Sequence, residues 1–172
     1  MKPRTLIQLA WLTVLLATSS CAGYRLGPTG GFKAGEKSVQ VSFFKNETLE
    51  PRIVEAVNQS LRKQFQKEGT FRLETQQGGD LIVTGKITQL LRNGLSYRST
   101  DVLAVTDFSM MLSAEIIVIE RVSGREVFSK KVTSTIPVSA SGDLVSQELR
   151  VLPLISDELA RKAVNLLADG AW

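Results

Sequence analysis

The sequence predicts an α+β fold in which two helices pack on one face of a four- to five-stranded mixed, mostly antiparallel sheet. Segments in which apolar and polar residues alternate, a pattern typical of half-buried strands, fill much of the middle of the chain. Two segments carry apolar residues at helical spacing, one after the first strand and one near the end of the chain. This order of strand, helix, strands and helix suits two helices that cover one side of a sheet and leave the other side open.

Residues 1–20 have the parts of a bacterial lipoprotein signal peptide: a basic start, an apolar run over residues 6–17, and small polar residues before Cys21. The run is shorter than the ~20 apolar residues that span a bilayer, so we expect cleavage. We expect Cys21 to be lipidated, because a lone exported cysteine has no disulfide partner. Thr18 stands where such signals usually carry an aliphatic residue, and ordinary cleavage near Ala17 with a free Cys21 thiol is the alternative.

The rest of the chain is predicted to be one domain behind a tether. Residues 21–37 form the lipidated N-terminus and a glycine-rich linker that contains Pro28. Residues 38–172 form a single α+β domain, because the 152 residues left after cleavage suffice for one compact core.

The composition disfavours several functional classes. The chain has no histidine and one cysteine, so it lacks the usual ligands of zinc and the usual bases for nucleophilic catalysis. We therefore predict no metal, no cofactor and no enzymatic activity. A lipid-anchored hydrolase with a carboxylate pair is the remaining enzymatic alternative. After cleavage, 19 basic residues face 17 acidic ones, a net charge of +2 that is too small to indicate nucleic-acid binding.

The first strand and first helix have clear boundaries. Residues 39–43 alternate as in a half-buried strand, and Asn46-Glu-Thr48 is interpreted as the turn that leads into a helix. Pro51 suits the first helical turn, and Gly69 suits a left-handed cap at the end. Apolar residues recur between them at four-residue intervals: Ile53, Val57, Leu61 and Phe65.

A hairpin is predicted next. Residues 71–75 form a short strand, and Gly78 and Gly79 form the turn into an alternating strand over residues 81–88.

Two further strands follow. Residues 106–120 form a long strand with one apolar face and one mostly polar face. Ser123 and Gly124 then turn the chain into a strand over residues 127–136. Adjacent lysines within it, Lys130 and Lys131, indicate either a bulge or an edge position.

The chain is predicted to end in an amphipathic helix, after a cap near Ser141 or Ser146. Pro153 either kinks this helix or marks its start. Its apolar residues recur at helical spacing: Leu152, Ile155, Leu159, Ala163 and Leu166.

The sheet face without helices is predicted to be polar and open. Its outward residues are small hydroxyls with scattered charges: Ser109, Ser113, Glu115, Ser129, Lys131, Thr133 and Thr135. Such a face is either simply solvated or lies against another polar surface, and it is a poor candidate for a hydrophobic dimer interface.

The order of motifs resembles the LptE family of lipopolysaccharide-assembly lipoproteins. The resemblance rests on the Cys-Ala-Gly-Tyr-Arg-Leu-Gly run that starts at Cys21, the strand over residues 39–44, and Asn46-Glu-Thr48 with Glu50-Pro51 after it. The Asp-Leu-Ile-Val-Thr-Gly run over residues 80–85 completes it. Together these motifs cover most of the mature chain.

The resemblance implies an outer-membrane, lipid-anchored protein on the periplasmic side that plugs the lumen of an LptD-like β-barrel and helps deliver lipopolysaccharide. A polar face suits a polar barrel lumen. The resemblance also implies binding of lipid A phosphates by basic residues on strands that we expect to be adjacent. The candidates are Lys86, Arg92, Arg98, Lys130 and Lys131. A periplasmic lipoprotein that pilots or scaffolds another envelope secretion or assembly complex is the alternative function.

Overall fold

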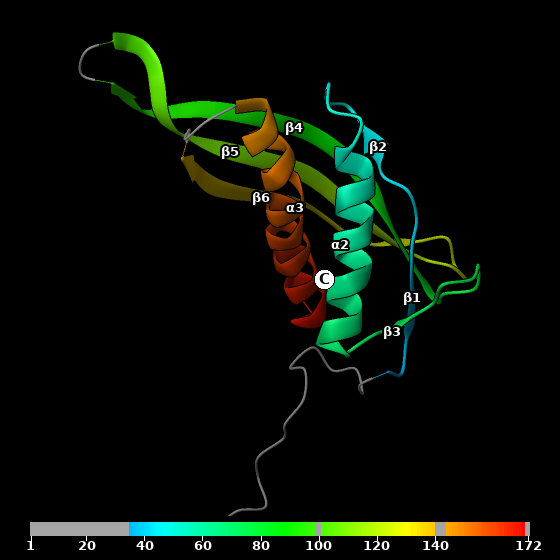
Figure 1. Cartoon of the computed structure of the whole chain (residues 1–172). Coiled ribbons are helices and arrows are strands. Elements are labelled where there is room, and N and C mark those ends of the chain that lie inside the picture. The colour runs from blue at the N-terminus through cyan, green and yellow to red at the C-terminus, as the bar shows by residue number, and fades with distance from the viewer. Residues whose placement is uncertain (1–34, 99–100, 140–143, 171–172) are drawn as a thin grey trace, which may run out of the picture.

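The computed structural model describes residues 35–98, 101–139 and 144–170, and it shows two helices packed on one face of a six-stranded sheet (Figure 1). Residues 1–20, Cys21 and residues 22–34 of the predicted tether lie outside this part of the chain. The elements in chain order are β1 (Ser38–Val41), β2 (Lys45–Asn46), α2 (Ile53–Glu68), β3 (Arg72–Leu73), β4 (Leu81–Arg98), β5 (Asp101–Glu120), β6 (Glu126–Ser139) and α3 (Leu144–Ala168).

The sheet is mixed, as predicted. Its strand order is β3-β1-β4-β5-β6, with β2 beside β4 farther along that strand. The long strands β4, β5 and β6 pair antiparallel, whereas the short strands β1, β2 and β3 make parallel pairs. The predicted α+β class is therefore confirmed, and the two-residue strand β2, which the sequence analysis did not predict, accounts for the larger number of strands.

The predicted hairpin between the strand after α2 and the strand at residue 81 is wrong. β3 pairs in parallel with β1, and β1 lies between β3 and β4, since Val39 is opposite Leu73 on one side and Leu81 on the other. The Asp80 carboxylate accepts hydrogen bonds from the Ser38 backbone N–H at 2.8 Å and from its hydroxyl at 2.7 Å. These bonds fix the start of β4 on the far side of β1, so the segment after β3 crosses that strand.

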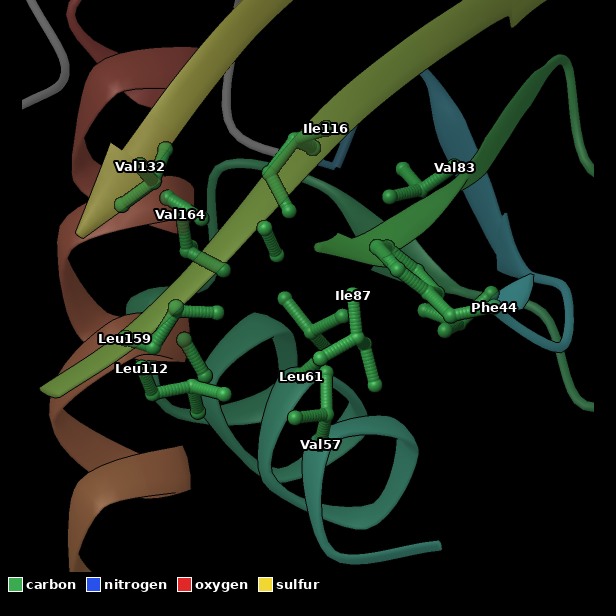
Figure 2. Packing of buried hydrophobic residues seen from close by; sticks show 14 of the residues in the cluster. Phe44, Val57, Leu61, Val83, Ile87, Leu112, Ile116, Val132, Leu159 and Val164 are labelled. Atoms are coloured by element: carbon green, nitrogen blue, oxygen red, sulfur yellow. The ribbon is translucent and has the colours of Figure 1, made fainter. Parts of the chain in front are cut away.

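The core lies between the helices and the sheet. The predicted stripe of α2 is fully buried, and so are Ile155, Leu159 and Ala163 of α3. Figure 2 shows Leu61 of α2 and Leu159 of α3 directed into the same interior as Ile87 and Leu112 of the sheet. The helical periodicity of the sequence therefore identified the buried faces correctly.

α3 begins at Leu144, well before Pro153, which lies inside the helix. Proline has no backbone N–H, so the carbonyl of Leu149 loses its usual intrahelical partner. Leu149 and Pro153 are both exposed, and water can therefore reach the carbonyl. At the other helix, Gly69 caps α2 in the predicted left-handed conformation, with φ of 77°.

Asp157 of α3 connects the two helices and should make stability depend on pH. Its carboxylate accepts hydrogen bonds from the Ser60 hydroxyl at 2.6 Å and the Lys63 ammonium at 2.8 Å, both on α2. Burial raises the pKa of Asp157, but the hydrogen bonds from Lys63 and Ser60 outweigh it and hold the pKa below its ordinary value. The ionised carboxylate therefore stabilises the fold above the pKa of the unfolded chain.

We expect Asp157→Asn to lower the free energy of unfolding by about 1 kcal/mol at pH 7, since the ion pair is half exposed. The difference from the unaltered protein should shrink below about pH 4, as the carboxyl of that protein becomes protonated. Urea denaturation at pH 7 and at pH 3 measures both effects, with Asp169→Asn at the exposed end of the chain as the control. A difference that persists unchanged at pH 3 would contradict the role of charge.

Candidate binding face of the sheet

The face of the sheet opposite the helices is the candidate functional surface. Leu112, Ala114 and Ile116 of β5 are buried under the helices, so Ser113 and Glu115 between them point to the other side. β6 adds Thr133 opposite Ser113 and Lys131 opposite Glu115. The predicted outward residues of these two strands therefore share one face, but Ser109 and Ser113 are buried on it, so the face is less open there than predicted.

A charged group lies in the middle of this face. The Lys86 ammonium of β4 lies 3.5 Å from the Glu115 carboxylate, and Lys131 is in register with Glu115 from the other side. A shallow hollow of about 350 Å³ extends from this group over residues 88–89 and 129–131. Two lysines around one carboxylate leave one positive charge, which favours an anionic group at this place.

Hydroxyl groups beside the charged group are already hydrogen-bonded to one another. The Ser113 and Thr133 hydroxyls are 3.0 Å apart, and the Thr88 hydroxyl donates to the Ser113 carbonyl at 3.2 Å. Thr88 can do so because it lies in a bulge between Ile87 and Gln89, where the register of β4 against β5 shifts. The Ser113 hydroxyl is itself buried, and Thr88 and Thr133 present the hydroxyls that reach the surface.

One end of the face is apolar, which the sequence analysis missed. Ile82 of β4 is opposite Ile119 of β5, and Ile117 continues the same side, all three being half-buried. The sequence does contain a signal for this apolar end. Residues 116–119 are four consecutive apolar residues, and a strand with such a run is apolar on both faces. The predicted polar, open face therefore does not extend to this end of the sheet.

The five candidate basic residues do not form one cluster. β5 lies between β4 and β6, so the assumption that their strands are adjacent was wrong, although Lys86 and Lys131 still share a face. Arg92 pairs in register with buried Met110, which places it on the helix side of the sheet. There it forms an ion pair with Glu148 of α3 and lies 5.9 Å from the ring centroid of Phe108.

The other two candidates occupy distinct surroundings. The Lys130 ammonium lies 5.5 Å from the ring centroid of Phe128 on the edge strand, and it also borders the hollow that Lys131 lines. Arg98 is opposite Asp101 at the far end of the β4–β5 hairpin, and its side chain lies outside the described part of the structure. The lysines of the outer face are therefore the basic residues that the fold brings together.

The described part of the chain contains no group of three metal-ligating side chains. Among its helices, none combines the length and apolar character needed to cross a bilayer.

The sequence matches a family model described as "LptE: Lipopolysaccharide-assembly" over residues 36–169. No curated protein sequence matches it. A protein of Xanthomonas campestris from the family DUF330 has a similar fold, with TM-score 0.63, 11% identity, and 86% of this chain and 92% of that chain covered.

Two further solved structures are similar. PelC from Paraburkholderia phytofirmans, described as a dodecamer, gives TM-score 0.53 at 16% identity over 82% of this chain and 93% of that one. A minor lipoprotein of Acinetobacter baumannii gives TM-score 0.54 at 12% identity over 78% of this chain and 94% of that one. At such identities, these likenesses show a common fold.

Proposed function

The chain belongs to the LptE family of lipopolysaccharide-assembly lipoproteins, and from this we propose that it plugs and helps assemble an LptD-like outer-membrane β-barrel that delivers lipopolysaccharide to the cell surface. The family match covers nearly all of the described domain and confirms the family that the order of motifs indicated. Membership in an assembly family also agrees with the prediction that the protein is not an enzyme.

The polar part of the outer sheet face is the observation that supports a plug. The lumen of a wide barrel is lined by polar residues and water. The exposed Thr133 hydroxyl and the group of Lys86, Glu115 and Lys131 offer hydrogen bonds and paired charges to such a wall, while the buried Ser113 hydroxyl holds Thr133 in place. The face therefore suits a polar, water-lined surface better than a lipid environment.

The lipid anchor is proposed to hold the plug at the periplasmic rim of the barrel. Lipidation of Cys21 would restrict the domain to the membrane surface, and the short linker would raise its effective concentration near the barrel. Mass spectrometry of the mature N-terminus tests this part directly. A mass that corresponds to an unmodified Cys21 would remove the anchor from the proposal and leave the plug to be judged separately.

Copurification tests the central part of the proposal. Affinity purification of the full chain from detergent-extracted outer membranes should yield one large β-barrel protein in stoichiometric amount. Depletion of the chain should then reduce lipopolysaccharide at the cell surface and leave that barrel misassembled. A different envelope complex, recovered from cells whose lipopolysaccharide stays normal, would favour the alternative function as a pilot or scaffold protein.

Lipopolysaccharide binding is proposed to involve Lys86 and Lys131 of the outer face and Lys130 at the edge of the hollow, together with Arg92 and Arg98 at separate places. Replacing both Lys130 and Lys131 with glutamate reverses two charges at the hollow. We expect binding of purified protein to lipopolysaccharide to weaken about tenfold or more, because charge-assisted bonds to phosphate are lost. Binding curves measured at equal ionic strength provide the test, with Lys67→Glu on α2 as the control. Unchanged binding by a folded double variant would exclude this site.

A further inference from the structure

The segment after β2 leaves the sheet abruptly, and the Asn46-Glu-Thr48 motif explains why. The last backbone bond between this segment and β4 runs from the Glu47 N–H to the Ile87 carbonyl at 2.9 Å. The Asn46 side-chain oxygen then accepts from the Thr48 N–H at 2.9 Å and from its hydroxyl at 2.8 Å. The Asn46 amide group donates to the Glu50 carbonyl at 3.0 Å. These bonds turn the chain away from β4 and into α2.

β4 continues for eleven residues after this point, to Arg98. On the side that β2 occupied, no strand of the described chain pairs with it beyond Ile87, whereas its other side pairs with β5. Alternate residues of a strand direct their backbone N–H and C=O groups to each side, so this open edge presents donors and acceptors without strand partners. Figure 1 shows β4 and β5 continuing beyond β2 as an arm.

A hollow of about 260 Å³ lies beside this edge on the helix side of the sheet, where Met110 and Glu148 also line it. Residues 48–50 border it on one side and residues 90–92 on the other. Leu49 is fully exposed, and 43% of the surface of Leu91 is exposed. Leu91 pairs with Met111 and points to the outer face, whereas Leu49 borders the hollow on the helix side. An added strand directs successive side chains to the two faces, so it would cover both leucines while it pairs with the free backbone groups.

The opposite edge of the sheet, formed by β6, is protected against the addition of a strand, unlike the open edge of β4. β6 carries Lys130, Lys131 and Pro137, and the Lys162 ammonium donates to the Thr133 carbonyl at 3.0 Å. Lysine and proline are the residues with which proteins commonly block strand addition at an edge. Residues 88–94 of β4 contain neither, and their single basic residue, Arg92, is paired with Glu148.

We propose that the open edge of β4, residues 88–94, binds an extended segment of a partner protein by strand addition, with one apolar side chain of that segment against Leu91 and a neighbouring one against Leu49. The identity of the partner rests on the proposed function, which makes it the outer-membrane barrel protein. The strands of a closed barrel have no free edge. The bound segment therefore comes from a loop or another part of the partner outside the barrel wall.

Site-specific photocrosslinking in cells tests this inference. The full chain is produced with benzoylphenylalanine at Leu49 or Leu91, or at Val122 as the control, which is an exposed apolar residue in the β5–β6 turn. The complex is purified after irradiation, and mass spectrometry maps the adducts. We expect both test positions to link to one short segment of the barrel protein, and the control position not to link to that segment.

The outcomes separate the two proposals. In one outcome the barrel copurifies, but the probes at Leu49 and Leu91 link only to lipid, to scattered segments or to nothing. That outcome overturns strand addition and leaves the proposed function intact. Absence of any barrel overturns both. As an independent check, Leu91→Lys places a charge at the edge and should reduce the recovered barrel about tenfold, whereas Val122→Lys should not. Full recovery with Leu91→Lys at unchanged thermal stability would also overturn strand addition.

Discussion

Gly85→Ala is expected to destabilise the domain by about 3 kcal/mol or more and to reduce its yield of folded protein sharply. A Cβ atom at this position would lie 1.9 Å from the Glu115 carbonyl oxygen and 2.8 Å from the Phe44 ring. The oxygen belongs to the backbone of β5, which is paired on both sides and cannot move independently. β4 and β5 would have to separate at the centre of the sheet to make room.

Chemical denaturation of the purified protein measures the loss, and Gly78→Ala is a matched control. A methyl group added at Gly78 would meet no other part of the chain within 4 Å, so this substitution should change the free energy of unfolding by less than about 0.5 kcal/mol. Equal stability of the two variants would show that β5 approaches Gly85 less closely than described. Because Glu115 makes this contact and Lys86 is the next residue after Gly85, the Gly85 variant should also displace the charged group of the outer face.

Phe65→Ala is expected to cost about 3–5 kcal/mol. Phe65 is fully buried on α2, and its ring meets that of Phe71 edge to face, with centroids 6.0 Å apart. Truncation leaves a cavity beneath the C-terminal end of α2 and removes the ring contact, which is worth about 0.5–1.5 kcal/mol beyond burial.

The midpoint of thermal unfolding reports this loss, and Phe43→Ala serves as the control. Phe43 is 76% exposed, so its truncation should shift the midpoint by only a degree or two. A similar shift for both variants would contradict the assignment of Phe65 to the core.

The parts of the fold that were predictable are those in which local periodicity and burial agree. The stripe from Ile53 to Phe65 is buried as its spacing indicated, and Gly69 ends the helix in the expected conformation. The edge position inferred from Lys130 and Lys131 is also confirmed, although the bulge of β6 lies nearer Phe128.

The errors concern pairing between distant segments, which periodicity does not encode. Nothing local in residues 71–75 distinguishes a hairpin from a parallel pair with β1, and the Ser38–Asp80 bonds that decide between them join residues 42 positions apart. The side of the sheet on which Arg92 lies was equally unpredictable from the sequence. The bulge at Thr88 exchanges the two sides of β4 for all residues beyond it.

The candidate site was predictable in its composition and only partly in its arrangement. Alternation placed Ser113, Glu115, Lys131 and Thr133 on one face, and the registers confirm this. That Lys86 joins them across Glu115 depends on the strand order, which required the structure.

The position of β1 between β3 and β4 has a consequence for how the chain folds. The β4–β5–β6 meander forms from neighbours in sequence, whereas β1 must find a partner about forty residues downstream, as Val39 does with Leu81. When the chain is made or exported from its N-terminus, the apolar residues of β1 and α2 are therefore exposed to solvent until β4 becomes available to cover them. We expect this interval to be the aggregation-sensitive stage of its biogenesis, at which a holding chaperone on the far side of the inner membrane would have its greatest effect.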